Sequence, residues 1–186
     1  MGTGRSGRYS GTRGSRTSAH RSGWKKGRTV SRSALKHANT GEIGHRLVNV
    51  KRGEYYFIPR LRAGGHGEAG RKLLDKNGIQ YNIVHTYPNG VRVGNVPDHL
   101  YEPKRKGIGQ SWFPKNWNGK MIKKAGEYVA NLKRNHNIGN GITAFGTYKG
   151  VRVGIKKTKG KISTVFPDSD QSKALNHKRG KNEHQE

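Results

Sequence analysis

The sequence predicts an α+β fold in which packed helices cover antiparallel β-sheets. Three observations indicate this class. The length of 186 residues suits one domain with flanking tails. Several strand-like segments are joined by short turn sequences, which favour antiparallel pairs. Helical segments gather in the front of the chain and strands in the back, whereas a parallel α/β fold would alternate them.

The first expected elements are a helix and a hairpin. Residues 68–76 (EAGRKLLDK) are typical of a short helix, and the Asn77-Gly78 pair that follows is a common helix stop. In the next segment, IQYNIVHTYPNGVRVGNV, two runs rich in β-branched and aromatic residues surround Pro88-Asn89-Gly90. This arrangement predicts a β-hairpin.

The main helix of the core is expected over residues 116–132, with Asn118 as its N-cap. Its apolar side chains recur at helical spacing and fall on one stripe. These side chains are Met121, Ile122, Ala125, Tyr128, Val129 and Leu132. A stripe of this kind should face a sheet or another helix.

Three further strands are expected after this helix, in the segments ITAFGTY, GVRVGIKKT and KISTVFP. Turns at Lys149-Gly150 and Lys159-Gly160 would join them. TYPNGVRVG and TYKGVRVG are similar, but the match is too short for a repeat architecture. We interpret both as hairpins with similar turn chemistry.

The two ends of the chain differ in composition from this central part. Residues 1–32 are mostly Gly, Ser, Thr and Arg, with no acidic residue and too few apolar ones to offset the entropy of ordering. We expect a disordered basic tail, either an Arg- and Gly-rich segment that binds single-stranded RNA or a plain linker. Residues 169–186 are expected to form a short polar tail, which leaves residues 33–168 as the domain.

The charge of the chain points to a polyanionic partner. Thirty-eight Lys and Arg residues against 11 Asp and Glu give a net charge of +27, which favours nucleic acid. The sequence has no long apolar run and no basic amphipathic helix, so we expect no membrane partner. The absence of cysteine excludes disulfides, Cys-ligated zinc and a thiol nucleophile. No ligand cluster indicates a metal or another cofactor.

RNA can be cleaved by histidines alone, because its own 2′-hydroxyl attacks the adjacent phosphate when one imidazole removes a proton and another supplies one. A hydroxyl or cationic donor must also stabilise the phosphate charge. His66 is the best single candidate among the nine histidines. The glycines around it in RAGGHG allow close approach of the backbone to a ligand. An ordinary exposed loop histidine is the alternative.

The remaining histidines are less distinctive. His37 and His45 flank a Gly-Glu pair, and neither is special by itself. His85 lies on an expected strand, where structural histidines are common. His99 begins a loop and could contact RNA or cap a turn. The aromatic residues of segment 109–117 precede the long helix, so we interpret them as core rather than as a base-stacking platform.

Four motifs, GGH, WFPKNW, FGTYKGVRVG and KISTVFP, occur in an order and spacing that resemble those of bacterial EndoU-type nuclease domains. Such domains are C-terminal modules of polymorphic and contact-dependent toxins. The resemblance covers residues 33–168. It implies an EndoU or ribonuclease A-like arrangement of two antiparallel sheets with packed helices. The site that it implies contains two histidines and a hydroxyl or lysine.

Carried over to this chain, the resemblance makes His66 the second histidine of the site and Thr164 the hydroxyl that binds the phosphate or the base. The first histidine would be His37, which stands in the family's H-x-x-x-G-E pattern. Its separation from His66 is longer than the family's, so His45 is the alternative. Where the family often has T-x-Y-P, this chain has Phe166, which can stack on a base but cannot supply a hydroxyl.

The resemblance therefore implies a metal-independent endoribonuclease and bacterial toxin domain. Its substrate would be single-stranded RNA, with tRNA among the candidates and uridine sites preferred. Attack by the 2′-hydroxyl would leave a 2′,3′-cyclic phosphate. A toxin of this kind needs an inhibitor in the producing cell, and the charge of the chain favours an acidic immunity protein. The first residues lack a signal peptide, so secretion or delivery into the cytoplasm of a target cell would need another export route or release from a precursor.

Two other functions remain open on the sequence. A non-catalytic basic RNA-binding protein, of ribosomal or phage-packaging type, would explain the charge equally well. A metal-dependent DNase is less favoured, because neither an H-N-H motif nor paired carboxylates occur. Convergence of His66 and Thr164 in one cleft would separate the ribonuclease from the pure binder, which has no need to bring them together.

Overall fold

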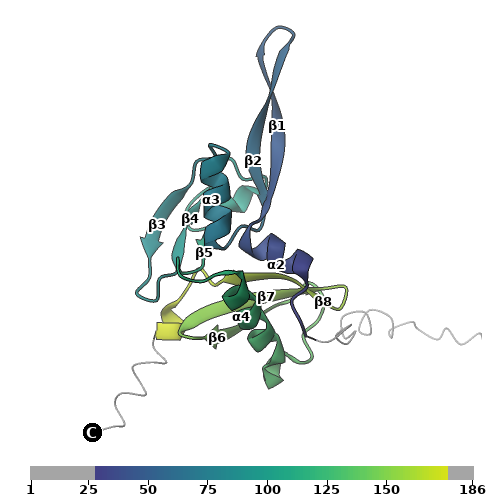
Figure 1. Ribbon diagram of the computed structural model, residues 1–186, viewed down its shortest axis with the longest axis vertical. Coiled ribbons are helices and arrows are strands. Elements are labelled where there is room, and N and C mark those ends of the chain that lie inside the picture. Colours follow the sequence, from purple (N-terminus) through teal and green to yellow (C-terminus); the bar gives the residue numbers. More distant parts are fainter. Residues whose placement is uncertain (1–27, 176–186) are drawn as a thin grey trace, which may run out of the picture.

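Two hydrophobic cores organise the protein, whose computed structural model describes residues 28–175 (Figure 1). The smaller core lies within an upper lobe. The larger core fills a lower lobe and reaches the upper lobe at Val91 and Val93. The upper lobe contains helix α3 (Glu68–Lys76) and the antiparallel sheet β3 (Asn82–Thr86), β4 (Arg92–Asn95) and β5 (Gln110–Trp112). The lower lobe contains helix α4 (Gly119–Asn131) and the antiparallel sheet β6 (Thr143–Tyr148), β7 (Val151–Thr158) and β8 (Lys161–Pro167).

Helix α2 (Arg32–Asn39) lies between the two lobes, and a long hairpin projects from the top of the molecule (Figure 1). The hairpin is formed by β1 (Glu42–Lys51) and β2 (Glu54–Ala63), which pair antiparallel. Two short 3-10 helices, η1 (Glu102–Lys104) and η2 (Lys133–Asn135), lie in the connections, and residues 172–175 at the end of the described chain are also helical. No helix within this part is long and apolar enough to cross a membrane.

The predicted α+β class is confirmed, and so are the elements on which it rested. Helix α3 has the predicted bounds. The side chain of Asn118 caps α4 by accepting a hydrogen bond from the amide of Met121 at 3.0 Å. Lys149 and Lys159 have φ values of 47° and 50° and are each followed by a glycine with positive φ. Positive φ at both central residues is the geometry of a two-residue hairpin turn.

The expectation of a helix-rich front and a strand-rich back is wrong, because the two longest strands form the β1–β2 hairpin near the front. The sequence pattern did not predict this hairpin, for a physical reason. Most of its side chains are exposed on both faces, so no alternation of buried and exposed residues is needed. Helix α2 and the three-residue strand β5 were likewise not expected.

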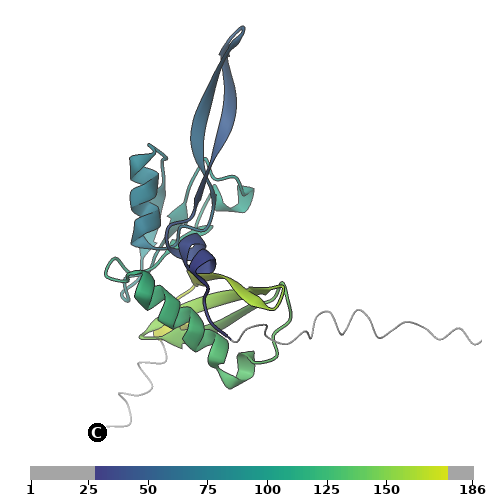
Figure 2. The same cartoon turned by 45° about the vertical axis from the view of Figure 1, so that its right-hand side comes forward.

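Helix α4 lies across one face of the β6–β7–β8 sheet (Figure 2). The stripe predicted on this helix is buried at Ile122, Ala125 and Val129, whereas Tyr128 is 45% exposed. The aromatic segment before the helix is core, as predicted, with Phe113 and Trp117 stacked at a centroid distance of 5.3 Å. These contacts fix the helix against the sheet.

The packed region extends beyond residues 33–168 at both ends. Val30 is buried against the larger core, and the hydroxyl of Ser31 caps α2 by accepting from the amide of Ala34. At the other end, the buried side chain of Gln171 bonds both the amide and the carbonyl of Arg152. The rest of the predicted tails, residues 1–27 and 176–186, lies outside the described residues.

The close approach of α4 to the sheet yields a first prediction. A Cβ on Gly126 would lie 2.6 Å from Cγ2 of Val165, which is fully buried. We expect Gly126→Ala to lower the free energy of unfolding by about 1–3 kcal/mol through overpacking, although Ala gains about 1 kcal/mol in helix propensity. Denaturant unfolding measures the change. Adding Val165→Ala should recover part of the loss, and purely additive losses would contradict the packing explanation.

Candidate active site

The end of helix α2 and the glycine-rich loop after β2 are joined by backbone hydrogen bonds. The last carbonyls of a helix have no partner within it and must find donors elsewhere. Here the amides of Gly65, His66 and Gly67 donate to the carbonyls of residues 37, 38 and 39, at 3.0, 2.7 and 3.0 Å. The ends of the two segments that carry His37 and His66 are therefore held together.

This junction explains why the loop contains adjacent glycines. Gly64 has a φ of +70°, and a Cβ on it would overlap the carbonyl oxygen of His37. Gly41, on the other side of the junction, has a φ of +79°, and a Cβ there would lie 2.6 Å from the amide nitrogen of Gly65. Backbone packs directly on backbone, so only glycine fits.

His66 is buried and is held by β5. Its Nδ1 lies 2.8 Å from the carbonyl oxygen of Ser111, so the ring donates from Nδ1 and keeps Nε2 for another partner. The amide of Phe113 donates to the carbonyl of His66 at 2.7 Å, and the Ser111 hydroxyl donates to the carbonyl of Pro167 at 2.7 Å. The ring is thus tied to β8 of the lower lobe through Ser111.

The surroundings of His66 favour its neutral form. Burial lowers the pKa of His66 well below its usual value of 6.5, and the positive charge of Lys104 lowers this pKa further. The hydrogen bond to Ser111 opposes these effects but is outweighed. At neutral pH the ring has a proton on Nδ1 and a free lone pair on Nε2, which is the state of a general base.

His37 has a different partner. Its Nδ1 lies 3.1 Å from Oε1 of Glu42, and both side chains are partly exposed. An ionised carboxylate can only accept hydrogen bonds, so the donor must be an N–H of the imidazole. The pair therefore fixes Nδ1 as the protonated nitrogen and directs Nε2 away from Glu42. His37 therefore pairs with a charged group, whereas His66 pairs with a neutral carbonyl.

Both histidines line one cavity of about 470 Å³ that also receives side chains from both lobes. Its volume is in the range of small-ligand sites, about 300–1,000 Å³. The polar and aromatic side chains around it are His37, Arg62, His66, His99, Tyr101, Lys104, Ser111, Thr143, Lys156, Thr164, Phe166, Asp168 and Ser169. The site is thus built where the lobes and α2 meet.

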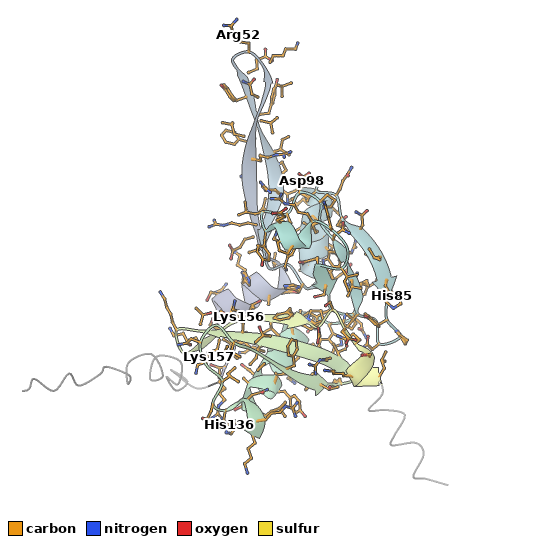
Figure 3. All side chains as sticks on the ribbon, turned by 180° about the vertical axis from the view of Figure 1, so that it is seen from behind. Arg52, His85, Asp98, His136, Lys156 and Lys157 are labelled. Carbon is orange, nitrogen blue, oxygen red and sulfur yellow. The ribbon has the colours of Figure 1, made fainter. Side chains whose placement is uncertain are left out.

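The lower sheet contributes a polar row to this cavity. Thr143 on β6 is the cross-strand partner of Lys156 on β7, and Lys156 is the partner of Thr164 on β8. Cross-strand partners point to the same face of a sheet. Figure 3 labels Lys156 on the side of this sheet that faces the upper lobe. A hydroxyl and an ammonium therefore stand side by side across from the histidines.

The upper lobe adds a second cation. Lys104 donates from Nζ to Oε1 of Gln110 at 2.7 Å, and burial lowers the pKa of Lys104 to about 8. Near it, His99 is 1% exposed and accepts from the amide of Tyr101 at Nδ1, so it caps a turn as one reading of the sequence proposed. Burial, followed by Lys104 and two arginines, lowers the pKa of His99 to about 4.

The structure places His37, His66 and Thr164 around this one cavity. His45 is not part of this cavity and lies exposed on β1, against the ring of Phe57. His85 is exposed at the outer strand of the upper sheet, against Tyr87 (Figure 3). Phe166 lines the cavity, with its ring centroid 5.8 Å from that of His66.

Sequence analysis missed Lys104, Lys156 and Ser111. Lys156 could have been found, because the register of the predicted last two strands would place it opposite Thr164. Ser111 could not, since it holds His66 through a backbone carbonyl that every residue type possesses. Within residues 28–175, no group of three or more His, Asp or Glu side chains is arranged to hold a metal ion.

A family model described as "Bacterial EndoU nuclease" matches residues 31–169, which is well over half of the chain. The matched range includes every side chain named above as lining the cavity. No curated protein and no solved structure matches the chain significantly.

The junction between α2 and the loop yields a second prediction. Gly64→Ala should reduce stability by at least about 2 kcal/mol more than Gly53→Ala, because the new methyl group overlaps the His37 carbonyl. Gly53 is a matched control, with a φ of +91° and no atom within 4 Å of an added Cβ. Equal losses on thermal or denaturant unfolding would show that only backbone strain matters.

Proposed function

The chain belongs to the bacterial EndoU nuclease family, and on this premise we propose that it is an endoribonuclease for single-stranded RNA. Cleavage would proceed by attack of the 2′-hydroxyl on the adjacent phosphate and leave a 2′,3′-cyclic phosphate. The observation that carries the proposal is that His37, His66 and Thr164 line the same cavity. An acid and a base placed around one phosphate need no metal to cleave RNA.

His66 is the general base of the proposed reaction. Its ring is neutral because burial lowers its pKa, and its Nδ1 proton is bound by Ser111. Nε2 then accepts the proton of the 2′-hydroxyl while the bond from the 2′-oxygen to phosphorus forms. The neutral carbonyl partner holds the tautomer without adding a negative charge to the ring.

His37 is the general acid. Glu42 holds Nδ1, so that Nε2 is the atom that gives a proton to the leaving 5′-oxygen as its bond to phosphorus breaks. One proton is taken up by His66 and one is released by His37, so the enzyme as a whole keeps its charge through the step.

Thr164 and two lysines bind the phosphate. The Thr164 hydroxyl and the ammonium of Lys156 are neighbours on the lower sheet, and Lys104 lines the same cavity from the upper lobe. Donors that are fixed before the reaction stabilise the charge that develops on the phosphate oxygens. Phe166 offers an aromatic face beside His66 on which a base can stack.

We further propose that the protein acts as a bacterial toxin in the cytoplasm of a target cell and is neutralised by an acidic immunity protein. The net charge of +27 supports both the attack on RNA and the acidic inhibitor. It attracts RNA without regard to sequence, and it favours an inhibitor of opposite charge that covers the cavity.

His66→Ala and His37→Ala should each reduce cleavage by roughly a hundredfold to ten-thousandfold, because each removes a proton-transfer group. RNA binding should remain, because one imidazole contributes little to binding beside a net charge of +27. Thr164→Ala should reduce cleavage by a comparable or smaller factor. Cleavage of labelled RNA in EDTA measures the effects, and the exposed histidines provide the controls His45→Ala and His85→Ala, which should keep wild-type rates. An active His66→Ala variant would exclude this mechanism.

The fall of kcat/KM at acidic pH should follow protonation of His66. The base must be neutral, so a lowered pKa keeps the enzyme active below pH 6.5 and activity declines only at lower pH. Removing the charge in Lys104→Met raises the pKa of His66 and moves this fall to higher pH, whereas Lys104→Arg should leave it in place. A fall at unchanged pH in Lys104→Met would show that His66 is not the titrating base.

A further inference from the structure

The β1–β2 hairpin exposes aromatic side chains that the proposed reaction does not use. Tyr55, Tyr56 and Phe57 are 58, 55 and 73% exposed. They are consecutive on β2, so Tyr56 points to the opposite face of the ribbon from its two neighbours. A two-stranded ribbon without a third strand or helix against it is only marginally stable in water. Rings held out on such a ribbon indicate a surface for a partner.

The cross-strand pairs hold these rings in place. Leu47, Val48 and Asn49 stand opposite Phe57, Tyr56 and Tyr55, respectively. Contacts between aliphatic and aromatic side chains across a strand pair stabilise a hairpin. Leu47 and Val48 therefore support Phe57 and Tyr56, whereas Tyr55 stands opposite the polar Asn49.

The charge of the hairpin fits a polyanion. Its two strands and turn contain five Lys and Arg residues (Arg46, Lys51, Arg52, Arg60 and Arg62) and only two acidic residues, Glu42 and Glu54. Arg52 lies at the tip (Figure 3). A second copy of the chain would bring like charges together, which is unfavourable. Aromatic rings interleaved with cations are the combination that binds single-stranded nucleic acid.

The hairpin is also continuous with the cavity. Strand β1 begins at Glu42, the partner of His37, and β2 ends at Ala63, directly before the loop that carries His66. Arg62 and Ala63 line the cavity itself. A nucleic acid that leaves the cavity along this wall therefore meets the hairpin next.

We propose that the β1–β2 hairpin is an RNA-binding arm that stacks substrate bases on Tyr55, Tyr56 and Phe57 and binds phosphates with Lys51 and Arg52. The inference rests on the proposed ribonuclease function. Phe57 and Ala63 are six residues apart, or about 20 Å along an extended strand. The arm therefore acts on RNA that extends several nucleotides beyond the cleavage site, and it has no contact with a dinucleotide.

The test compares two substrates and two variants. The substrates are a dinucleotide and a single-stranded RNA of twenty nucleotides with one cleavable site. The arm variant is Tyr55→Ala/Tyr56→Ala/Phe57→Ala. Tyr128→Ala is the matched control, because Tyr128 is an exposed aromatic residue on α4 that does not line the cavity. Circular dichroism and thermal unfolding check that the lobes remain folded.

We expect the arm variant to lose at least about tenfold in kcat/KM on the long RNA, since stacking contributes strongly for each base. Its kcat/KM on the dinucleotide should stay within twofold of wild type, and Tyr128→Ala should match wild type on both. An equal loss on both substrates would overturn the proposal, because the hairpin would then act on the cavity itself. No loss on either would also overturn it and would point to a protein partner for the arm.

Binding of a 2′-O-methyl RNA of the same length separates this proposal from the proposed chemistry. The methylated RNA cannot be cleaved by 2′-hydroxyl attack, so its dissociation constant does not depend on catalysis. We expect the arm variant to bind it at least about tenfold more weakly than wild type, even if the wild-type protein cleaves neither substrate. Failure of cleavage with this loss of binding would reject the reaction alone, and unchanged binding would reject the arm.

Discussion

The structure depends on how one short helix ends. The last carbonyls of α2 need donors, and they receive the amides of Gly65, His66 and Gly67 from the far end of the β1–β2 hairpin. The two backbones approach so closely that a side chain at Gly64 would overlap the helix. This contact sets the distance between the segments of His37 and His66, which are separated in the chain by the whole hairpin. An insertion between the two histidines is therefore compatible with a fixed site.

The two imidazoles that we propose as general acid and general base have different surroundings. One ring is buried, bound to a carbonyl and close to a cation, and the other is partly exposed and bound to a carboxylate. Environments that differ in this way assign different roles to the same residue type. The lower sheet supplies the opposite wall, where Lys156 and Thr164 are fixed by strand pairing rather than by a flexible loop. The cavity thus needs both lobes, and neither lobe contains the site alone.

The sequence predicted the structure correctly where local chemistry determines it, as at helix caps and tight turns. Asn118 caps its helix, and the Lys-Gly pairs close two-residue turns with positive φ, as their types require. The glycines beside His66 marked close backbone packing, although the partner proved to be a helix end of the protein itself. The hairpin gave no signal, because a ribbon exposed on both faces needs no apolar alternation. Lys104 was missed for another reason: it lines the cavity because of where η1 lies in the fold, which no local pattern encodes.

We propose that the two imidazoles cleave RNA through its own 2′-hydroxyl. The most direct test is ³¹P NMR of the products formed from a defined oligoribonucleotide and from a copy with a single 2′-deoxy sugar at the cleavage site. We expect a 2′,3′-cyclic phosphate signal with the first substrate and no cleavage of the second at that site. Cleavage of the deoxy copy, or products with a 5′-phosphate and no cyclic phosphate, would contradict it.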